Sequence, residues 1–183
     1  MKVERTFGKM TFWAVLVSAV IVMFGVGTVT LAKAASLTPD EEADLIFQRE
    51  EEKLAHDVYL RMYEKWGAAI FSNILASEAR HMDTMLKMLN KYGVPDPAAG
   101  KGIGEFSNED IKNLYDALVE KGSISLINAL QVGVEIEEID ITDIQEALKH
   151  TKKRDLTTAY TNLLNGSNNH LEAFEQALAA QAQ

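Results

Sequence analysis

Cysteine is absent from the 183 residues of this chain. Disulfides, zinc-thiolate sites, iron-sulfur clusters and cysteine nucleophiles are therefore excluded. Any metal ion must be held by carboxylates and imidazoles. The chain also lacks a glycine-rich phosphate loop after a strand, a Gly-x-Ser-x-Gly motif and a basic face interspersed with aromatic residues. We therefore expect neither phosphate-loop chemistry, serine-hydrolase chemistry nor nucleic-acid binding.

Charged residues are missing from residues 10–32, an apolar run that follows three basic residues. The run is longer than the ~7–15 apolar residues of a signal peptide and close to the ~20 that span a bilayer. Ala32 and Ala34 supply small residues at the spacing of a cleavage site. We therefore predict that residues 1–34 are either a signal peptide or an uncleaved membrane anchor. In both cases the remainder lies outside the cytoplasmic membrane, secreted, periplasmic or tethered.

The exported part is strongly acidic. The chain has a formal charge of −9, and residues 1–34 carry four basic side chains and one acidic one, so the remainder has a charge of −12. Such a surface disfavours nucleic acid and anionic lipid and mildly attracts cations.

Proline is scarce, with three residues in the chain, and no stretch after Pro39 alternates apolar and polar residues as a strand does. Helical periodicity is found instead, with Thr38 as the N-cap of the first helix and Ser107 as a possible N-cap of a short one. Capping residues, glycines and prolines bound the predicted helices at about 39–66, 69–92, 107–122, 125–150 and 154–180, the last of which contains the polar sequence NGSNN.

Four of these helices are long, and about thirty residues with one short helix join the second long helix to the third. An up-down bundle needs only short loops, and a solenoid needs a repeat that is absent. The sequence therefore predicts one all-α domain over residues 38–180, a four-helix bundle with a long crossover.

The second helix places Glu78 and His81 in its apolar line, between Phe71 and Met85. A carboxylate and an imidazole in the core need a metal ion, a counter-charge or a hydrogen-bond network. A single Glu-x-x-His pair occurs often by chance, so the other helices decide between these explanations.

Each of the other long helices also places an acid or an imidazole in its apolar line. Glu137 is the central acid of the 125–150 helix, with Glu138 as the second choice. His170 is the inward imidazole of the last helix. In the first helix, Glu51 and Glu52 both lie beside apolar positions, and the alternative is a solvated acidic face that also includes Glu50.

The sequence resembles the ferritin-like superfamily, in particular rubrerythrin-like di-iron carboxylate bundles, and more closely an uncharacterised prokaryotic family of that superfamily. The resemblance covers about residues 40–178 and rests on REEEKLAHDVYLRMYEKWG, FSNILASEARHMD, YGVPDP, IEEIDITDIQEAL and NLLNGSNNHLEAF. In the first helix, the rubrerythrin ligand glutamate precedes an alanine by three positions and a tyrosine by seven. Glu52, with Ala55 and Tyr59, matches this spacing.

The resemblance implies a ferritin-like four-helix bundle that binds two iron ions, or iron and manganese. Its implied ligands are Glu52, Glu78, His81, Glu137 and His170, and Tyr59 is a nearby redox or hydrogen-bonding group. The alternates are Glu51, Glu138, His56 and Asp140.

One position departs from the family pattern. The last helix should supply Glu-x-x-His, but Ser167 stands three residues before His170. Asp140, one turn after Glu137, is one replacement for the missing carboxylate. His56, one turn after Glu52, is another source of a ligand. Without a replacement the second metal ion is held weakly or is absent, which leaves one metal ion.

Two classes of function are expected. The first is a di-iron oxidoreductase, of ferroxidase or peroxidase type, that reacts with oxygen or peroxide and takes electrons from an external donor, because a rubredoxin-like iron site requires cysteine. The second is a non-catalytic envelope module for metal storage or partner binding. The resemblance also suggests a homodimer.

Overall fold

The structure is a computed structural model that describes residues 36–181. The predicted signal peptide or anchor at residues 1–34 lies outside this range. Residues 36–181 form five α-helices and no strand, which confirms the predicted all-α class. Among these five, no helix combines the length and the apolar character that crossing a membrane requires.

The helices are α1 (Pro39–Trp66), α2 (Ala69–Tyr92), α3 (Glu109–Gly122), α4 (Leu126–His150) and α5 (Arg154–Gln181). Helix α1 begins at a capping box, in which Thr38 Oγ1 accepts from Glu41 N–H and the Glu41 carboxylate accepts from Thr38 N–H. Helices α1 and α2 both end at a glycine in the left-handed region, Gly67 with φ 65° and Gly93 with φ 72°.

The N-cap of α3 corrects a prediction. Asn108, not Ser107, is the N-cap, and its side chain accepts hydrogen bonds from the backbone N–H groups of residues 110 and 111. The backbone N–H groups of Ser107 and Asn108 instead donate to the Glu50 carboxylate of α1. Glu50 is therefore buried, because it satisfies donors at the start of α3.

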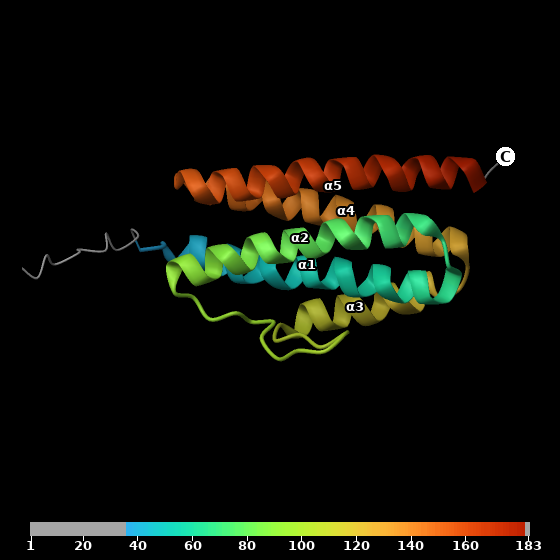
Figure 1. Ribbon diagram of the computed structural model, residues 1–183, viewed down its shortest axis with the longest axis horizontal. Helices are drawn as coiled ribbons and strands as arrows, with labels where there is room; N and C mark the ends of the chain where they lie inside the picture. The colour runs from blue at the N-terminus through green and yellow to red at the C-terminus, as the bar shows by residue number, and fades with distance from the viewer. Residues whose placement is uncertain (1–35, 182–183) are drawn as a thin grey trace, which may run out of the picture. The chain divides into compact units, whose positions relative to one another are not determined.

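The four long helices pack side by side. Helix α1 contacts α2 and α4, α5 contacts the same two helices, and α3 covers α1 and α4 (Figure 1). The connection over residues 93–125 returns the chain along the bundle, so α2 and α4 run in the same direction (Figure 1). The solvated acidic face considered for α1 is absent, since Glu50, Glu51 and Glu52 are all buried.

Charged residues on α1 also hold the crossover in place. The Arg49 guanidinium donates two hydrogen bonds to Asp96, at 3.0 and 3.2 Å. The Lys53 ammonium donates to Gly102 O at 2.7 Å and pairs with Asp57. These charges are buried because each has a partner in the crossover or on α1 itself.

The hydrophobic core consists of two clusters. The first includes Leu54, Ile74, Ile136 and Phe174, and the second includes Leu45, Met85, Ile144 and Leu163. Each long helix contributes to both clusters and leaves a gap of two or more turns between its contributions. These gaps contain buried polar residues: Gln48, Glu51 and Glu52 on α1, Glu78 and His81 on α2, Glu137 and Asp140 on α4, and Ser167 and His170 on α5. A polar layer therefore divides the core.

Candidate metal centre

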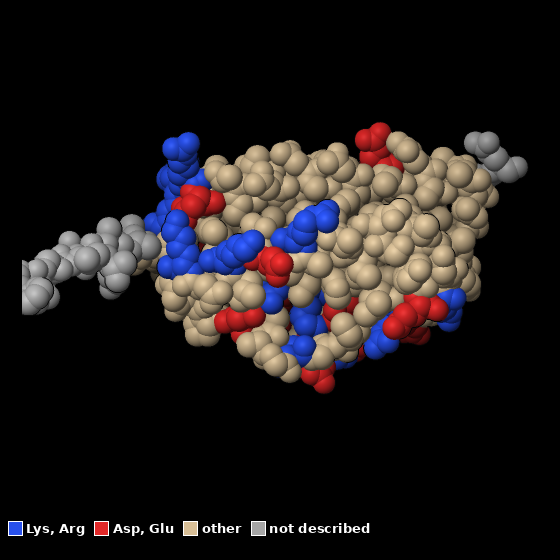
Figure 2. Space-filling view, in the orientation of Figure 1, with Lys and Arg blue, Asp and Glu red and all other residues tan. Residues whose placement is uncertain are grey.

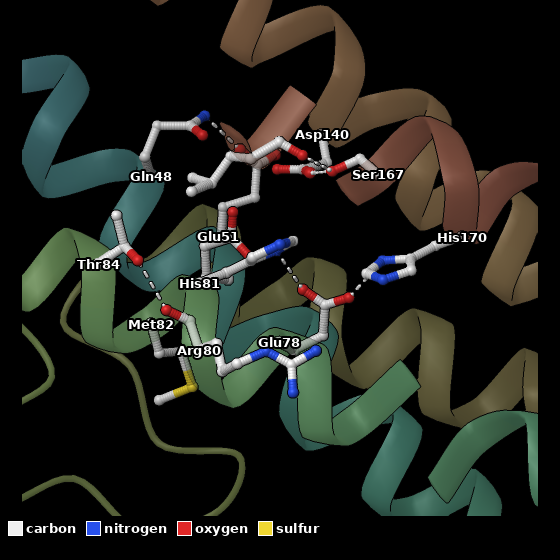
Figure 3. A network of polar contacts seen from close by, with 12 residues as sticks. Gln48, Glu51, Glu78, Arg80, His81, Met82, Thr84, Asp140, Ser167 and His170 are labelled. Atoms are coloured by element: carbon white, nitrogen blue, oxygen red, sulfur yellow. Dashed lines mark hydrogen bonds and ion pairs between the residues drawn. The ribbon is translucent and has the colours of Figure 1, made fainter. Parts of the chain in front are cut away.

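Glu78 lies at the middle of the polar layer, between two imidazoles. Its Oε2 atom is 3.0 Å from His81 Nδ1, and its Oε1 atom is 2.7 Å from His170 Nδ1 (Figure 3). The sequence places both Glu78 and His81 on the inward side of α2, and their exposed fractions are 2% and 9%. One carboxylate thus contacts a histidine from its own helix and one from α5.

Glu52 completes the first group of possible ligands. Its Oε2 atom is 3.1 Å from His81 Nδ1. One ligand atom from each of Glu52, Glu78 and His81 lies within 4.8 Å of the other two. Helices α1 and α2 therefore bring two carboxylates and one imidazole together.

Glu137 completes a second group. Its Oε1 atom is 3.5 Å from His170 Nδ1, and one ligand atom from each of Glu78, Glu137 and His170 lies within 4.8 Å of the others. The rings of His81 and His170 are 5.6 Å apart between centroids. Because Glu78 belongs to both groups, the arrangement matches two adjacent cation sites that share one carboxylate.

The alternate ligands lie in different surroundings in the structure. Glu51 is buried beside the groups, where its Oε2 atom accepts a hydrogen bond of 2.7 Å from Gln48 Nε2. Glu138 is exposed on the outside of α4. His56 belongs to neither group, and its Nδ1 atom lies 3.0 Å from the Asp57 carboxylate, which also pairs with Lys53.

Asp140 is the alternate that lies in the polar layer beside Ser167, the residue that stands where a glutamate was expected. The Ser167 hydroxyl of α5 donates a hydrogen bond to Asp140 Oδ2, and Asp140 is 5% exposed (Figure 3). Ser167 therefore does not leave a gap in the layer. It holds a carboxylate that α4 supplies, at the position where the di-iron bundles that the sequence resembles have one from the last helix.

Tyr59 borders the second group. Its hydroxyl donates to Glu137 Oε1 at 2.7 Å and approaches Gly133 O at 3.5 Å. Its ring lies 5.2 Å from the Phe174 ring and 6.3 Å from the Phe71 ring, between centroids. The hydroxyl orients a possible ligand, while the aromatic rings exclude water from one side of the centre.

Several atoms of the layer fit a cation because they have no hydrogen-bond partner. They are Glu52 Oε1, Glu78 Oε1, Asp140 Oδ1 and His170 Nδ1. Although Glu78 Oε1 and His170 Nδ1 are close, they are not aligned as acceptor and donor. Burying unpaired polar atoms is costly, and a divalent cation that accepts lone pairs from converging oxygen and nitrogen atoms removes the cost.

Burial, reinforced by neighbouring negative charges, raises the pKa values of three acids of the layer. Burial raises the pKa of Glu52 well above its usual range, and the charges of Asp140 and Glu78 add to the shift. Burial and the charge of Glu137 likewise raise the pKa of Asp140. Burial raises the pKa of Glu137 to about 7. A bound cation would oppose these shifts, because its positive charge stabilises the ionised carboxylates.

Glu78 and His170 shift in opposite directions. Although burial opposes its ionisation, the close contacts with the His170 and His81 imidazoles lower the pKa of Glu78 to about 2. Burial opposes the charge on His170, but interaction with Glu137 and Glu78 raises its pKa to about 10. In the metal-free domain the Glu78 carboxylate is therefore ionised. The protonated ring of His170 supplies a positive charge beside it.

The family described as "Uncharacterized protein domain (DUF2202)" matches residues 41–183 of this chain. The chain belongs to this family. Its membership of an uncharacterised family is thereby confirmed, and the matched residues include every member of the two groups of possible ligands.

One relative of this DUF2202 chain, MJ0754, matches both in sequence and in a crystal structure. Uncharacterized protein MJ0754 of Methanocaldococcus jannaschii is 46% identical over 142 residues, which cover 78% of this chain and 77% of that protein. The crystal structure described as hypothetical protein MJ0754 from Methanococcus jannaschii DSM 2661 matches with a TM-score of 0.80 and 44% identity, over 82% of this chain and 86% of that chain.

A more distant structure shares the fold alone. The crystal structure of a DUF305 fragment from Deinococcus radiodurans matches with a TM-score of 0.59 and 16% identity, over 80% of this chain and 99% of that chain. The arrangement of helices in this DUF2202 domain is therefore compatible with very different sequences.

Gly166 is a residue of the DUF2202 site that our sequence analysis missed. A Cβ atom at this position would lie 2.5 Å from both Cε1 and Nε2 of His81. Only glycine lets α5 pass this close to the imidazole. The signal was an isolated glycine inside a helical pattern, where glycine costs ~1 kcal/mol relative to alanine and a packing reason can explain it, but the partner on α2 is not visible in the sequence.

Proposed function

We propose that this DUF2202 domain is a ferritin-like metal-binding protein that holds two divalent cations, two iron ions or iron and manganese, and reacts with oxygen or peroxide. The observation that carries the proposal is the position of Glu78, whose two oxygens serve two groups, each completed by a further carboxylate and a histidine.

Four carboxylates of the layer, Glu52, Glu78, Glu137 and Asp140, fit two divalent cations in charge and in chemistry. Glu52 and His81 would hold one ion, Glu137 and His170 the other, and Glu78 both. Asp140 would supply the carboxylate that the family pattern has at position 167. Four ionised carboxylates balance two divalent cations, and the oxygen and imidazole donors suit iron and manganese.

Ferrous ions bound here would supply electrons to oxygen or peroxide, and an external donor would restore them. The chain's own residues orient and protect the ligands. Tyr59 donates a hydrogen bond to Glu137, which fixes the direction of that carboxylate. Ser167 does the same for Asp140. Phe71 and Phe174 pack against Tyr59 and keep water from that side.

The architecture supports the ferritin-like part of the proposal. In such bundles a long crossover joins two pairs of helices, and the metal ligands project inward from all four long helices. This chain has such a crossover between α2 and α4. Its inward ligands come from α1, α2, α4 and α5 at the level where the hydrophobic core is divided.

Anaerobic titration of the purified full-length protein with Fe²⁺ tests the proposal. We expect close to two bound equivalents, followed by oxidation of the bound iron when oxygen or hydrogen peroxide is added. Glu78→Ala should bind neither ion tightly. Absence of tight binding by the wild-type chain would overturn the proposal. Two bound ions that neither oxidant converts to Fe³⁺ would replace the oxidoreductase with a storage protein.

We also propose that the protein is exported across the cytoplasmic membrane. The apolar run at residues 10–32 is the sole basis of this proposal. The mass of the mature protein after expression in a prokaryotic host distinguishes the two forms of export. Loss of about the first 34 residues indicates a signal peptide, and a full-length chain in the membrane fraction indicates an anchor. A full-length chain in the cytoplasm would contradict export.

A further inference from the structure

Acidic residues occupy every third position along one part of α4: Glu137, Asp140, Asp143 and Glu146. Each step advances about 4.5 Å along the helix and turns about 60° around it. The acids therefore wind from the core to the surface. The exposed fraction is 2% for Glu137 and 5% for Asp140, Asp143 is half-buried, and the Glu146 side chain is 54% exposed. We call these four residues the carboxylate staircase.

The outer part of the staircase opens into a pocket between α1 and α4. The pocket has a volume of about 100 Å³ and is lined by Asp44, Phe47, Gln48, Asp143, Glu146 and Ala147. Polar residues continue inward on the α1 side as well, from Asp44 to Gln48 and then to Glu51 and Glu52. Acidic side chains from two helices thus lead from solvent to the candidate metal centre.

Gln48 separates the pocket from the buried acids. It lines the pocket, is itself buried, and donates a hydrogen bond of 2.7 Å from Nε2 to Glu51 Oε2. Its Oε1 atom has no hydrogen-bond partner. A residue that lines the pocket therefore has a buried carbonyl oxygen without a partner, a type of ligand that divalent cations accept.

We propose that the pocket and the carboxylate staircase are the route by which a divalent cation reaches the centre. The cation binds first at Asp143, passes Gln48 and Glu51, and is transferred to Asp140 and the two ligand groups. A divalent cation leaving water requires oxygen ligands at each step through a low-dielectric core. This route rests on the proposed function, because it leads to the metal site proposed above.

The distribution of charged residues favours entry of a cation between α1 and α4 rather than through the surface of α2 and α5. In Figure 2 the surface over the first half of α2 and the second half of α5 carries few charged side chains, and residues 67–77 contain none. At the rim of the pocket, His150 pairs with Asp44 and Lys149 pairs with Glu146. Asp143 has no ion pair with a basic group of residues 36–181, so it is free to take a cation.

Stopped-flow mixing of the metal-free full-length protein with Co²⁺ alone measures uptake through the visible absorption of the bound ion. We expect Asp143→Asn and Glu51→Gln each to slow uptake by about tenfold or more, because acidic clefts raise the local cation concentration and the association rate. The final stoichiometry should stay at the wild-type value. Salt should slow the wild type more than Asp143→Asn.

Glu175→Gln is the matched control, since it makes the same change of charge at an exposed position of α5. It should take up Co²⁺ at the wild-type rate. Equal rates for the wild type, Asp143→Asn and Glu51→Gln would overturn the route and leave the metal site intact. Loss of a bound equivalent in Glu51→Gln would also overturn it, by making Glu51 a permanent ligand. Failure of the wild type to bind Co²⁺ would overturn route and metal site together.

Discussion

The Ser167 hydroxyl on α5 donates a hydrogen bond to Asp140 Oδ2 on α4, and the other carboxylate oxygen of Asp140 has no hydrogen-bond partner. The two residues come from different helices and together place one carboxylate at the level of His170. A bundle that requires a negative charge at this level can obtain it from either helix.

Asp140 should therefore be required for the second metal ion. We expect Asp140→Ala to lower the stoichiometry from about two equivalents to about one in anaerobic Fe²⁺ titration. The double variant Asp140→Ala with Ser167→Glu should restore two equivalents, because the new glutamate completes Glu-x-x-His and occupies the space that Asp140 vacates. Full binding by Asp140→Ala alone would show that Asp140 is not a ligand.

Glu78 should be more important than the other carboxylates, because it serves both groups. We expect Glu78→Gln to abolish tight binding of both ions, whereas Glu137→Gln should mainly weaken the ion next to His170. Isothermal titration calorimetry with Mn²⁺ separates the two results. Glu138→Gln is the control, since Glu138 is exposed beside Glu137 and should bind as the wild type does. Similar losses in Glu78→Gln and Glu137→Gln would argue against a shared carboxylate.

Gly166→Ala should weaken metal binding by displacing His81, whose ring atoms would lie 2.5 Å from the added Cβ. Alanine at an unhindered helical position stabilises by about 1 kcal/mol relative to glycine, so a lower melting temperature would itself reveal the clash. We expect an affinity loss of about 10–100-fold, as for changes that disturb the orientation of a ligand. Asn165→Ala, at the exposed neighbouring position, should leave the affinity unchanged.

The metal-free domain should become less stable as the pH rises from 5 to 9. Glu137 has a folded pKa of about 7, above its usual 4.5, and His170 has one of about 10, above its usual 6.5. Both groups bind more protons in the folded state within this window, so the free energy of unfolding falls with rising pH. The contribution of Glu137 is lost as the pH rises from about 4.5 through about 7, and that of His170 as it rises from about 6.5 through about 10.

Urea denaturation in the presence of a chelator at pH 5, 7 and 9 checks this direction. We expect a total loss on the order of a few kcal/mol. Glu137→Gln should reduce the loss between pH 5 and 7, since it removes one of the titrating groups. Binding of a cation at neutral pH should release protons from the same groups, measurable in buffers of different ionisation enthalpy. A stability that rises with pH would contradict the shifts.

Some residues of the candidate site could be predicted from helical periodicity, and others could not. Helical periodicity and the polar interruptions of each apolar line placed Glu78, Glu137 and His170 inward, and all three are buried. The choice of Glu52 over Glu51 came from a family resemblance rather than from periodicity, because both positions border apolar neighbours. The structure shows Glu52 in contact with His81 and Glu51 in contact with Gln48.

Local signals in the sequence were sufficient for the helices themselves, since caps, glycines and periodicity act within a few residues along the chain. Distances between helices depend on how the helices pack, and no local signal contains them. For that reason only the tertiary structure showed that Glu78 serves two histidines, that Ser167 holds Asp140 and that Gly166 makes room for His81. The metal-binding proposal rests on these contacts between helices.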